Sequence, residues 1–176
     1  MSKLTVVYLT DTWHVLAALT RTAPPKGTEP AGALVGTGLP VRFIGNLPAD
    51  ATVSAQDLAL ATVDDQPGVL ISPQSYKVVF DSKGQAQVQN AGAAGQVTLA
   101  IDTQHGATIT GVTASLPARV GLQNVTSPGP AHTVLSPVTV GPGGTVVRQA
   151  GFAAGEKWNM YALVQGLPPV VKNFTL

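Results

Sequence analysis

The sequence contains no cysteine, little charge and few aromatic residues. The absence of Cys from 176 residues excludes a disulfide framework, thiolate metal ligands and a thiol nucleophile. Charged residues make up 11% of the chain, less than half of the roughly 25% that is usual in soluble domains. Aromatic residues make up 5%, but a hydrophobic share of 44% still suffices for a core. The chain is therefore predicted to fold and not to be intrinsically disordered.

Long apolar runs are absent as well. No stretch approaches the roughly 18 apolar residues that a membrane-spanning helix needs, so we expect no membrane span. Near the N-terminus, Asp11 and His14 interrupt the sequence before the apolar stretch of a secretory signal accumulates. We therefore expect synthesis in the cytoplasm without a signal peptide.

Glycine and proline limit the length of any helix. The sequence has 19 Gly and 14 Pro, and only residues 1–23 and 49–66 form windows longer than ten residues without either. Val, Ile and Thr supply 46 residues, and β-branched side chains favour pleated strands. We predict an all-β fold with little helix, an antiparallel β-sandwich or a barrel-like fold, built as one body or as two small β domains.

Alternation of apolar and polar residues assigns the first strands. Residues 4–10 are predicted to form a strand, and residues 13–20 return beside it, with a helix capped by Asp11 as the alternative. The Pro- and Gly-rich residues 22–40 are interpreted as a loop, followed by a short strand over residues 41–44.

Residues 57–63 also alternate and are predicted to form a strand, although residues 54–57 fit the capping box that begins a helix. Turn residues 64–68 then lead into the apolar residues 69–71.

The strongest local signal is a β-hairpin. Alternating apolar side chains place one face of residues 76–80 opposite one face of residues 85–89. Residues 81–84 between them end in Gly84, which supplies the positive φ that a tight hairpin turn favours.

Small, flexible residues at 90–95 are predicted to be a domain linker. In this interpretation residues 1–90 form an N-terminal β domain that carries the Pro/Gly-rich loop 22–40. Residues 96–176 form a charge-poor β-sandwich-like domain. The alternative is one long loop inside a single sandwich.

Seven more strands are predicted beyond the linker, at the roughly 8–12-residue spacing that is typical of sandwiches and barrels. They cover residues 96–103, 107–113, 120–125, 133–140, 145–149, 157–165 and 170–176. Residues 141–144 are predicted to form a turn between two of them. Residues 158–164 are apolar on both faces and are predicted to form a central strand.

Charge is distributed unevenly along the chain. Residues 1–90 hold six Lys or Arg and seven Asp or Glu. The charged residues of the second half, 91–176, are Asp102, Arg119, Arg148, Glu156, Lys157 and Lys172. A free globular surface normally carries a much higher density of charge. Part of this half is therefore predicted to be covered by another chain, or else its solubility depends on Thr, Gln, Asn and Ser.

Histidine is the first residue type to consider for acid–base chemistry. Asp11 and Asp102 each stand three residues before a histidine, His14 and His105, but on a strand that spacing directs the two side chains to opposite faces. His132 has no carboxylate nearby in the sequence. We therefore predict no catalytic residue. A hydrolase would need one of the three histidines beside a carboxylate in a cleft.

Sequence motifs for a nucleophile, a cofactor or a metal are also missing. The chain has no Gly-x-Ser-x-Gly elbow and no phosphate-binding loop, and residues 36–40 lack the spacing of a dinucleotide-binding turn. Asp64 and Asp65 are adjacent carboxylates in a Pro-Gly turn, which are usually solvated. We predict no cofactor and no metal site.

Nucleic-acid binding and carbohydrate binding require different kinds of residues. The ten basic residues are scattered and balanced by nine acidic ones, so nucleic-acid binding is not expected. Carbohydrate binding would require an exposed aromatic ring. Trp13 and Trp158 both lie in apolar alternating segments, and we predict that they pack in the core.

These observations favour a non-enzymatic structural subunit of a large assembly, such as a component of a phage-like or tail-like particle or a capsid decoration. We expect it to associate with itself or with other subunits through neutral β interfaces, and to reside finally in the assembled particle, which can be extracellular after release. Val170, Phe174 and Leu176, on one face of the C-terminal strand, are the interface candidates, because a terminal strand can extend a neighbour's sheet. The alternative function is a carbohydrate-binding or adhesion β-sandwich module.

Overall fold

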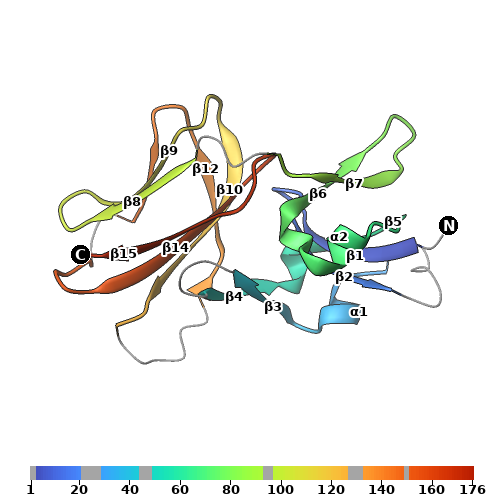
Figure 1. Ribbon diagram of the computed structural model, residues 1–176, viewed down its shortest axis with the longest axis horizontal. Coiled ribbons are helices and arrows are strands. Elements are labelled where there is room, and N and C mark those ends of the chain that lie inside the picture. The colour runs from blue at the N-terminus through green and yellow to red at the C-terminus, as the bar shows by residue number, and fades with distance from the viewer. Residues whose placement is uncertain (1–2, 21–28, 44–48, 93–96, 127–132, 149–150) are drawn as a thin grey trace. The chain divides into compact units, whose positions relative to one another are not determined.

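The computed structural model of this chain is all-β, as predicted (Figure 1). It describes residues 3–20, 29–43, 49–92, 97–126, 133–148 and 151–176. Of these residues 58% lie in strands and 10% in helices, and the two α-helices are short. No helix in the described part of the chain is long and apolar enough to cross a membrane.

The chain divides into two compact units, each made of non-contiguous segments. Unit 1 contains residues 1–39, 53–93 and 165–168. Unit 2 contains residues 40–52, 94–164 and 169–176. The chain therefore passes from one unit to the other several times.

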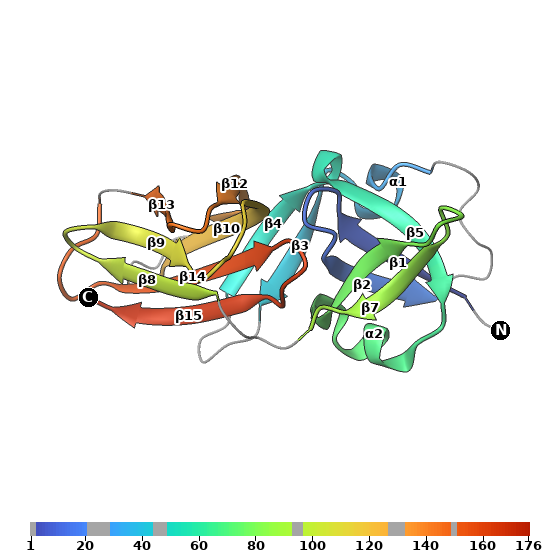
Figure 2. The same ribbon diagram turned by 90° about the horizontal axis from the view of Figure 1, so that it is seen from above.

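Unit 1 is built on a three-stranded antiparallel sheet of order β2-β1-β5 (Figure 2). Its strands are β1 (Lys3–Leu9), β2 (Val15–Thr20) and β5 (Leu58–Asp64). Central β1 is buried after its first residue. Because β2 pairs with β1 from Leu4↔Thr20 onward, the predicted returning strand is confirmed and the helix alternative is wrong.

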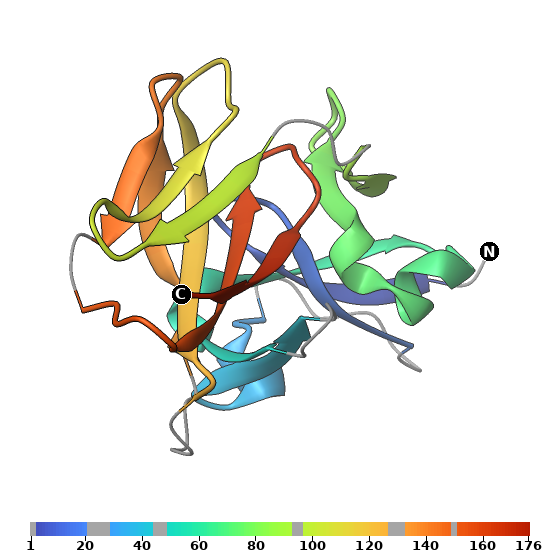
Figure 3. The ribbon, with the colours of Figure 1, turned by 60° about the vertical axis from the view of Figure 1, so that its left-hand side comes forward.

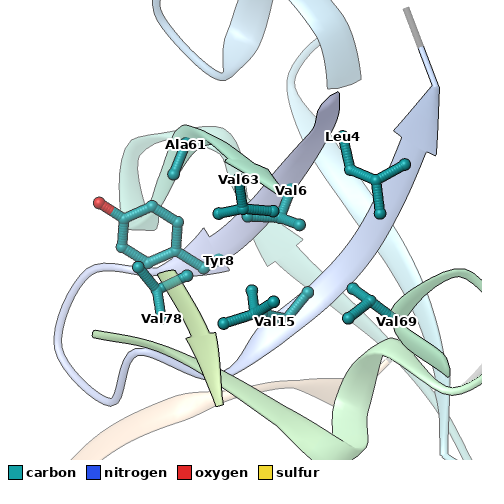
Figure 4. Close-up of a cluster of buried hydrophobic side chains, with 9 residues drawn as sticks. Leu4, Val6, Tyr8, Val15, Ala61, Val63, Val69 and Val78 are labelled. Atoms are coloured by element: carbon teal, nitrogen blue, oxygen red, sulfur yellow. The ribbon is translucent and has the colours of Figure 1, made fainter. Parts of the chain in front are cut away.

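The core of unit 1 is a cluster of small and medium apolar side chains (Figure 4). Its buried members are Leu4, Val6, Tyr8, Val15, Ala61, Val63, Val69, Val78 and Val88. They come from the three-stranded sheet, from helix α2 (Pro67–Ile71) and from the hairpin of β6 (Tyr76–Phe80) and β7 (Ala86–Asn90). Valine dominates this core, as the composition indicated.

The hairpin prediction is confirmed. β6 pairs with β7 in antiparallel register, from Tyr76↔Asn90 to Phe80↔Ala86. Asp81 Oδ1 accepts hydrogen bonds from the backbone N–H groups of Lys83 and Gln85, both at 2.8 Å. Gly84 has φ +75°, which supplies the left-handed residue of the turn.

Two short segments of unit 1 differ from the simple strand-and-loop interpretation. The described part of residues 22–40 is not all loop, because helix α1 (Gly32–Val35) and the start of β3 (Gly38–Phe43) lie there; residues 21–28 are outside the described ranges. Residues 69–71 belong to α2, a single helical turn with Pro67 at its start.

The segment before β5 combines the two interpretations made for it. Ser54 Oγ accepts from the N–H of Gln56 at 3.3 Å and caps the 3₁₀ turn η1 (Ala55–Asp57). Strand β5 then begins at Leu58. A second 3₁₀ turn, η2 (Pro73–Ser75), precedes β6.

Unit 2 contains a four-stranded sheet of order β12-β10-β14-β15 and a three-stranded sheet of order β13-β9-β8 (Figure 3). The first is formed by β10 (Leu116–Asn124), β12 (Ser136–Val140), β14 (Lys157–Val164) and β15 (Val170–Thr175). The second is formed by β8 (Thr98–Asp102), β9 (Gly106–Thr110) and β13 (Thr145–Arg148). The prediction of a central strand is confirmed, because β14 is buried from Trp158 to Val164 and lies between β10 and β15.

The two sheets of unit 2 meet at both of their sides. On one side, Lys172 Nζ of β15 donates to the carbonyl of Leu99 in β8 at 3.1 Å. On the other, the predicted turn over residues 141–144 joins β12 to β13, with Gly144 at φ +87°. A small third sheet has the order β11-β4-β3, in which β11 (Thr133–Val134) runs parallel to β4 (Ala49–Ser54).

Candidate functional site

The connection between β1 and β2 is a strained turn that exposes a tryptophan. Trp13 has φ +62°, the one positive φ at a non-glycine residue in the described ranges. Its N–H donates to the Leu9 carbonyl and its own carbonyl accepts from the N–H of Val78, both at 2.9 Å. The side chain is 40% exposed. The prediction that Trp13 packs in the core is wrong, because Trp13 lies in the turn and the alternating strand begins only at Val15.

His14, the next residue, is fully buried. Its Nε2 lies 2.7 Å from the carbonyl oxygen of Leu167 and donates to it. Burial lowers the pKa of His14 to about 4, and the positive charge of Lys77 acts in the same direction. The imidazole is therefore neutral near pH 7, and its hydrogen bond holds a distant segment instead of serving acid–base chemistry.

Lys77 holds the same segment as His14. Its Nζ donates to the Gly166 carbonyl at 3.4 Å, next to the carbonyl that His14 binds. His14 and Lys77 form an antiparallel bridge at the edge of β6. The two side chains thus fix residues 165–168 within unit 1.

The Asp11/His14 pair lies in a turn, and the opposite-face argument for it does not apply. β1 ends at Leu9 and β2 begins at Val15, so neither residue is part of a regular strand. The negative charge of Asp11 raises the pKa of His14 but is outweighed by burial. Thr12 Oγ1 is buried without a hydrogen-bond partner in the described part of the chain.

The Asp102/His105 pair forms the turn between β8 and β9. Asp102 accepts hydrogen bonds from the backbone N–H groups of Gln104 and His105, and the bond from His105 is the main cause of its lowered pKa. Its other carboxylate oxygen lies 3.2 Å from His105 Nδ1. The expectation of opposite faces is again wrong, because the chain turns here. Both side chains are more than half exposed, which indicates a turn cap with a surface histidine.

The remaining polar candidates do not gather into a site. Asp64 forms an exposed ion pair with Lys3 at 2.6 Å. Within the described ranges, no group of three or more His, Asp or Glu residues has the arrangement of a metal site. His132 lies outside the described residues.

The few charged side chains of the second half are mostly engaged inside unit 2. Arg119 is buried and donates to the Leu135 carbonyl at 3.4 Å. Lys172 binds the Leu99 carbonyl and also lies 5.1 Å from the centre of the Phe174 ring. Asp102 caps its own turn. Lys157, at the start of β14, is exposed.

Arg148 and Glu156 are held by an aromatic cluster. The Arg148 guanidinium carbon lies 5.0 Å from the centre of the Phe152 ring and 5.1 Å from that of Trp158, within cation–π range. Glu156 accepts from the Trp158 indole N–H and the Ala153 backbone N–H, both at 2.9 Å, and these bonds lower its pKa, the bond from Ala153 most strongly. Trp158 is buried, which confirms its predicted core packing.

A groove with one charged residue in its lining lies beside the edge strands β12 and β13. Its volume is about 380 Å³. The lining residues are Val120, Leu122, Ser136, Pro137, Val138, Val146, Val147 and Arg148. Val146 is 49% exposed. Arg148, the charged residue of the lining, is the one stacked on the aromatic cluster.

The three interface candidates of the C-terminal strand share one edge of unit 2. Val170 and Phe174 lie in β15, the outermost strand of the four-stranded sheet, and Leu176 follows its end. All three are half-buried. Leu176 donates its N–H to the Glu156 carbonyl at 3.0 Å, which continues the pairing beyond β15.

The chain matches no protein-family model and shows no significant similarity to a curated protein.

Three features are evident only in the structure: the exposed Trp13, the hydrogen bonds to the Leu167 and Gly166 carbonyls, and the groove at β13. The exposure of Trp13 is not evident from the sequence, because its neighbours are apolar. The anchors join residues far apart in the sequence, which no local pattern predicts.

Proposed function

We propose that this chain is a non-enzymatic structural subunit of a large multi-protein assembly, such as a phage-like or tail-like particle component or a capsid decoration. The observation that carries this proposal is the small number of charged residues between 91 and 176 and the contacts that they make within unit 2. Five of the six charged residues between 91 and 176 bond or stack within the unit: Asp102, Arg119, Arg148, Glu156 and Lys172. The exposed charged residues between 91 and 176 are Asp102, Arg148, Lys157 and Lys172, so this half of the chain presents few charges to solvent.

A neutral β surface of this kind is suited to association. Charged side chains normally keep exposed sheet edges apart, and Lys on an edge strand is a common means. The described edge strand β13 presents the half-exposed Val146 beside a groove in whose lining Arg148, held by an aromatic cluster, is the one charged side chain. We infer that other copies or other subunits cover such surfaces in the native assembly.

The histidines support a non-enzymatic role. His14 is enclosed, neutral near pH 7 and bonded to a backbone carbonyl. His105 serves an exposed turn. Of the two histidines in the described ranges, neither combines a cleft with a nearby carboxylate, the arrangement that a hydrolase requires.

The mass of the native protein in solution tests the proposal. We expect light scattering at micromolar concentration to give a particle several times heavier than the 17.9 kDa chain. Purification of the chain from its native cells is expected to recover the same particle, alone or with other subunits. A stable monomer that recovers no partner contradicts the proposal.

A second candidate function is carbohydrate binding at Trp13. The exposed ring on a strained turn is the observation that favours it, because sugars stack on exposed aromatic faces and strained residues concentrate at functional sites. In that case a glycan-array signal is present in the native chain and is lost in Trp13→Ala. Trp158→Phe, a change inside the core, retains the signal. An array without signal for the native chain removes this candidate.

A further inference from the structure

Helix α2 presents two adjacent apolar side chains to solvent. Leu70 is 43% exposed and Ile71 is 81% exposed, the highest value among the large hydrophobic residues of the described ranges. Single exposed apolar residues are normal on a protein surface, whereas contiguous ones are a feature of interaction sites. Leu70 and Ile71 together form an apolar projection, the α2 knob, at the end of this helical turn.

The backbone that carries the α2 knob is firmly held. The preceding residue, Val69, is fully buried in the core of unit 1. The Val69 N–H donates to the Gln66 carbonyl and the Ser72 N–H donates to the Gly68 carbonyl, both at 2.9 Å. Gly68 itself lies so close to Tyr76 Oη that a side chain would not fit there. A backbone held in this way loses little conformational freedom when the knob is bound.

Negative charge accompanies the α2 knob. Asp64 and Asp65 lie just before α2 and are exposed, and residues 64–75 contain no basic residue. Asp64 is bonded to Lys3 at 2.6 Å, so one of the two negative charges is compensated and the segment keeps a net negative charge. The segment therefore combines exposed apolar side chains with negative charge.

The groove of unit 2 has the complementary properties. It lies beside β12 and β13, each of which is the outermost strand of its sheet (Figure 2), and most of its lining residues are apolar. Arg148, the charged residue of the lining, is exposed, and residues 133–148 contain no acidic residue. The volume of about 380 Å³ is near the lower end of the roughly 300–1,000 Å³ of ligand sites, which suits a small apolar projection.

We propose that the α2 knob of one copy of this chain inserts into the groove of unit 2 of a second copy, with Asp65 directed toward Arg148. The inference rests on the proposed structural function and names the partner and the two surfaces that join. A second copy fits as the occupant because the same chain carries the apolar projection, the apolar groove and opposite charges beside them. Apolar burial supplies the affinity, and the opposite charges select which surfaces meet.

The proposed contact repeats from copy to copy. It joins two different surfaces, so a copy that has bound through its α2 knob still offers its groove. Such heterologous contacts build rings or open filaments, according to the rotation between successive copies. In both, the chain is a repeated subunit of an assembly, as the proposed function requires.

Two lysine substitutions separate the two surfaces. Ile71→Lys places a charge on the α2 knob and Val146→Lys places one on the wall of the groove, and each charge must lose its water when the surfaces meet. We expect each variant alone to self-associate at least tenfold more weakly than the native chain, by light scattering over a dilution series. Gln87→Lys, which adds the same charge at an exposed position of β7, and the conservative Ile71→Leu should associate like the native chain.

A mixture of the two lysine variants tests whether the two surfaces meet each other. Val146→Lys chains keep the native α2 knob and Ile71→Lys chains keep the native groove. We expect an equimolar mixture to form a complex of one copy of each variant and nothing longer, because the other two surfaces both carry lysine. A mixture that stays monomeric overturns the proposal.

Ile71→Lys alone also decides the question. Circular dichroism verifies that each variant folds, and Ile71 is the more exposed position, so its variant remains a test if Val146→Lys does not fold. Association of Ile71→Lys at the native level overturns the proposal, even where Val146→Lys weakens association, because a different occupant then fills the groove.

The native mass separates this result from a failure of the proposed function. If both the native chain and Ile71→Lys are multimeric, the structural function stands and another surface joins the copies. If the native chain is monomeric but is recovered with other subunits, only the contact between copies fails. If it is monomeric and recovers no partner, both proposals fail.

Discussion

At the scale of single residues, the buried His14 connects two distant segments of the chain. One hydrogen bond to the Leu167 carbonyl joins positions 153 apart in the sequence. The imidazole makes this bond in its neutral form, and burial disfavours the charged form. The stability of the fold is therefore linked to the protonation of His14.

His14 predicts a loss of stability in mild acid. Its pKa is about 4 in the folded chain and about 6.5 when unfolded, so the unfolded chain binds the extra proton between these values and stability falls as pH falls. We expect the free energy of unfolding to decrease by about 2 kcal/mol from pH 7 to pH 5, a range above the titration of most carboxyl groups. Urea titrations at several pH values measure it.

His14→Gln provides the decisive variant for this linkage, because the amide can still donate to the Leu167 carbonyl but does not titrate. Its unfolding free energy is expected to change little between pH 7 and pH 5. A native slope in His14→Gln rules out His14 as its source.

The turns that contain His14 and His105 show what the sequence does not predict. The three-residue spacing of Asp11 and Asp102 from their histidines predicts opposite faces only within a strand, but the chain turns at both pairs. Trp13 was expected in the core because its neighbours are apolar. The geometry of a turn determines whether a residue within it is exposed. The alternation of apolar and polar residues does not show at which residue the turn ends and the strand begins.

At the scale of elements, sequence patterns worked best where the contacts are local. The β6–β7 hairpin combines alternation with a turn that contains Asp81 and Gly84, and both features act within a few residues. The central position of β14 was evident because both of its faces are apolar. The sheet orders and the division of residues 40–52 and 165–168 between units depend on distant pairings, which no local pattern encodes.

The edge strand β13 allows the neutral-surface account to be tested by one substitution. Val146→Lys places a charge beside the groove of β12 and β13, where an approaching strand would have to desolvate it. We expect self-association to weaken at least tenfold, equivalent to about 1.4 kcal/mol, with little change in the stability of the fold. Light scattering over a dilution series measures the association.

Gln87→Lys is the matched control, since it adds the same charge at an exposed position of β7. Its association is expected to equal that of the native chain. Equal association in Val146→Lys, Gln87→Lys and the native chain excludes the β13 edge from the interface.

At the scale of the whole molecule, the low content of charged residues and the all-β fold both favour association with other chains. Uncharged Thr, Val and Ala strands make broad surfaces, and most of the few charged residues between 91 and 176 also bond or stack with other groups of unit 2. Association through such surfaces depends on apolar burial and backbone pairing. It should therefore be insensitive to salt, which screens exposed charges strongly.

The mass of the native chain at low and high ionic strength tests this claim most directly. We predict a multimer by light scattering at micromolar concentration, with the same mass in roughly 0.05 M and 1 M sodium chloride, where the screening length differs several-fold. A monomer of 17.9 kDa in both solutions, or a multimer that dissociates at high salt, contradicts the account.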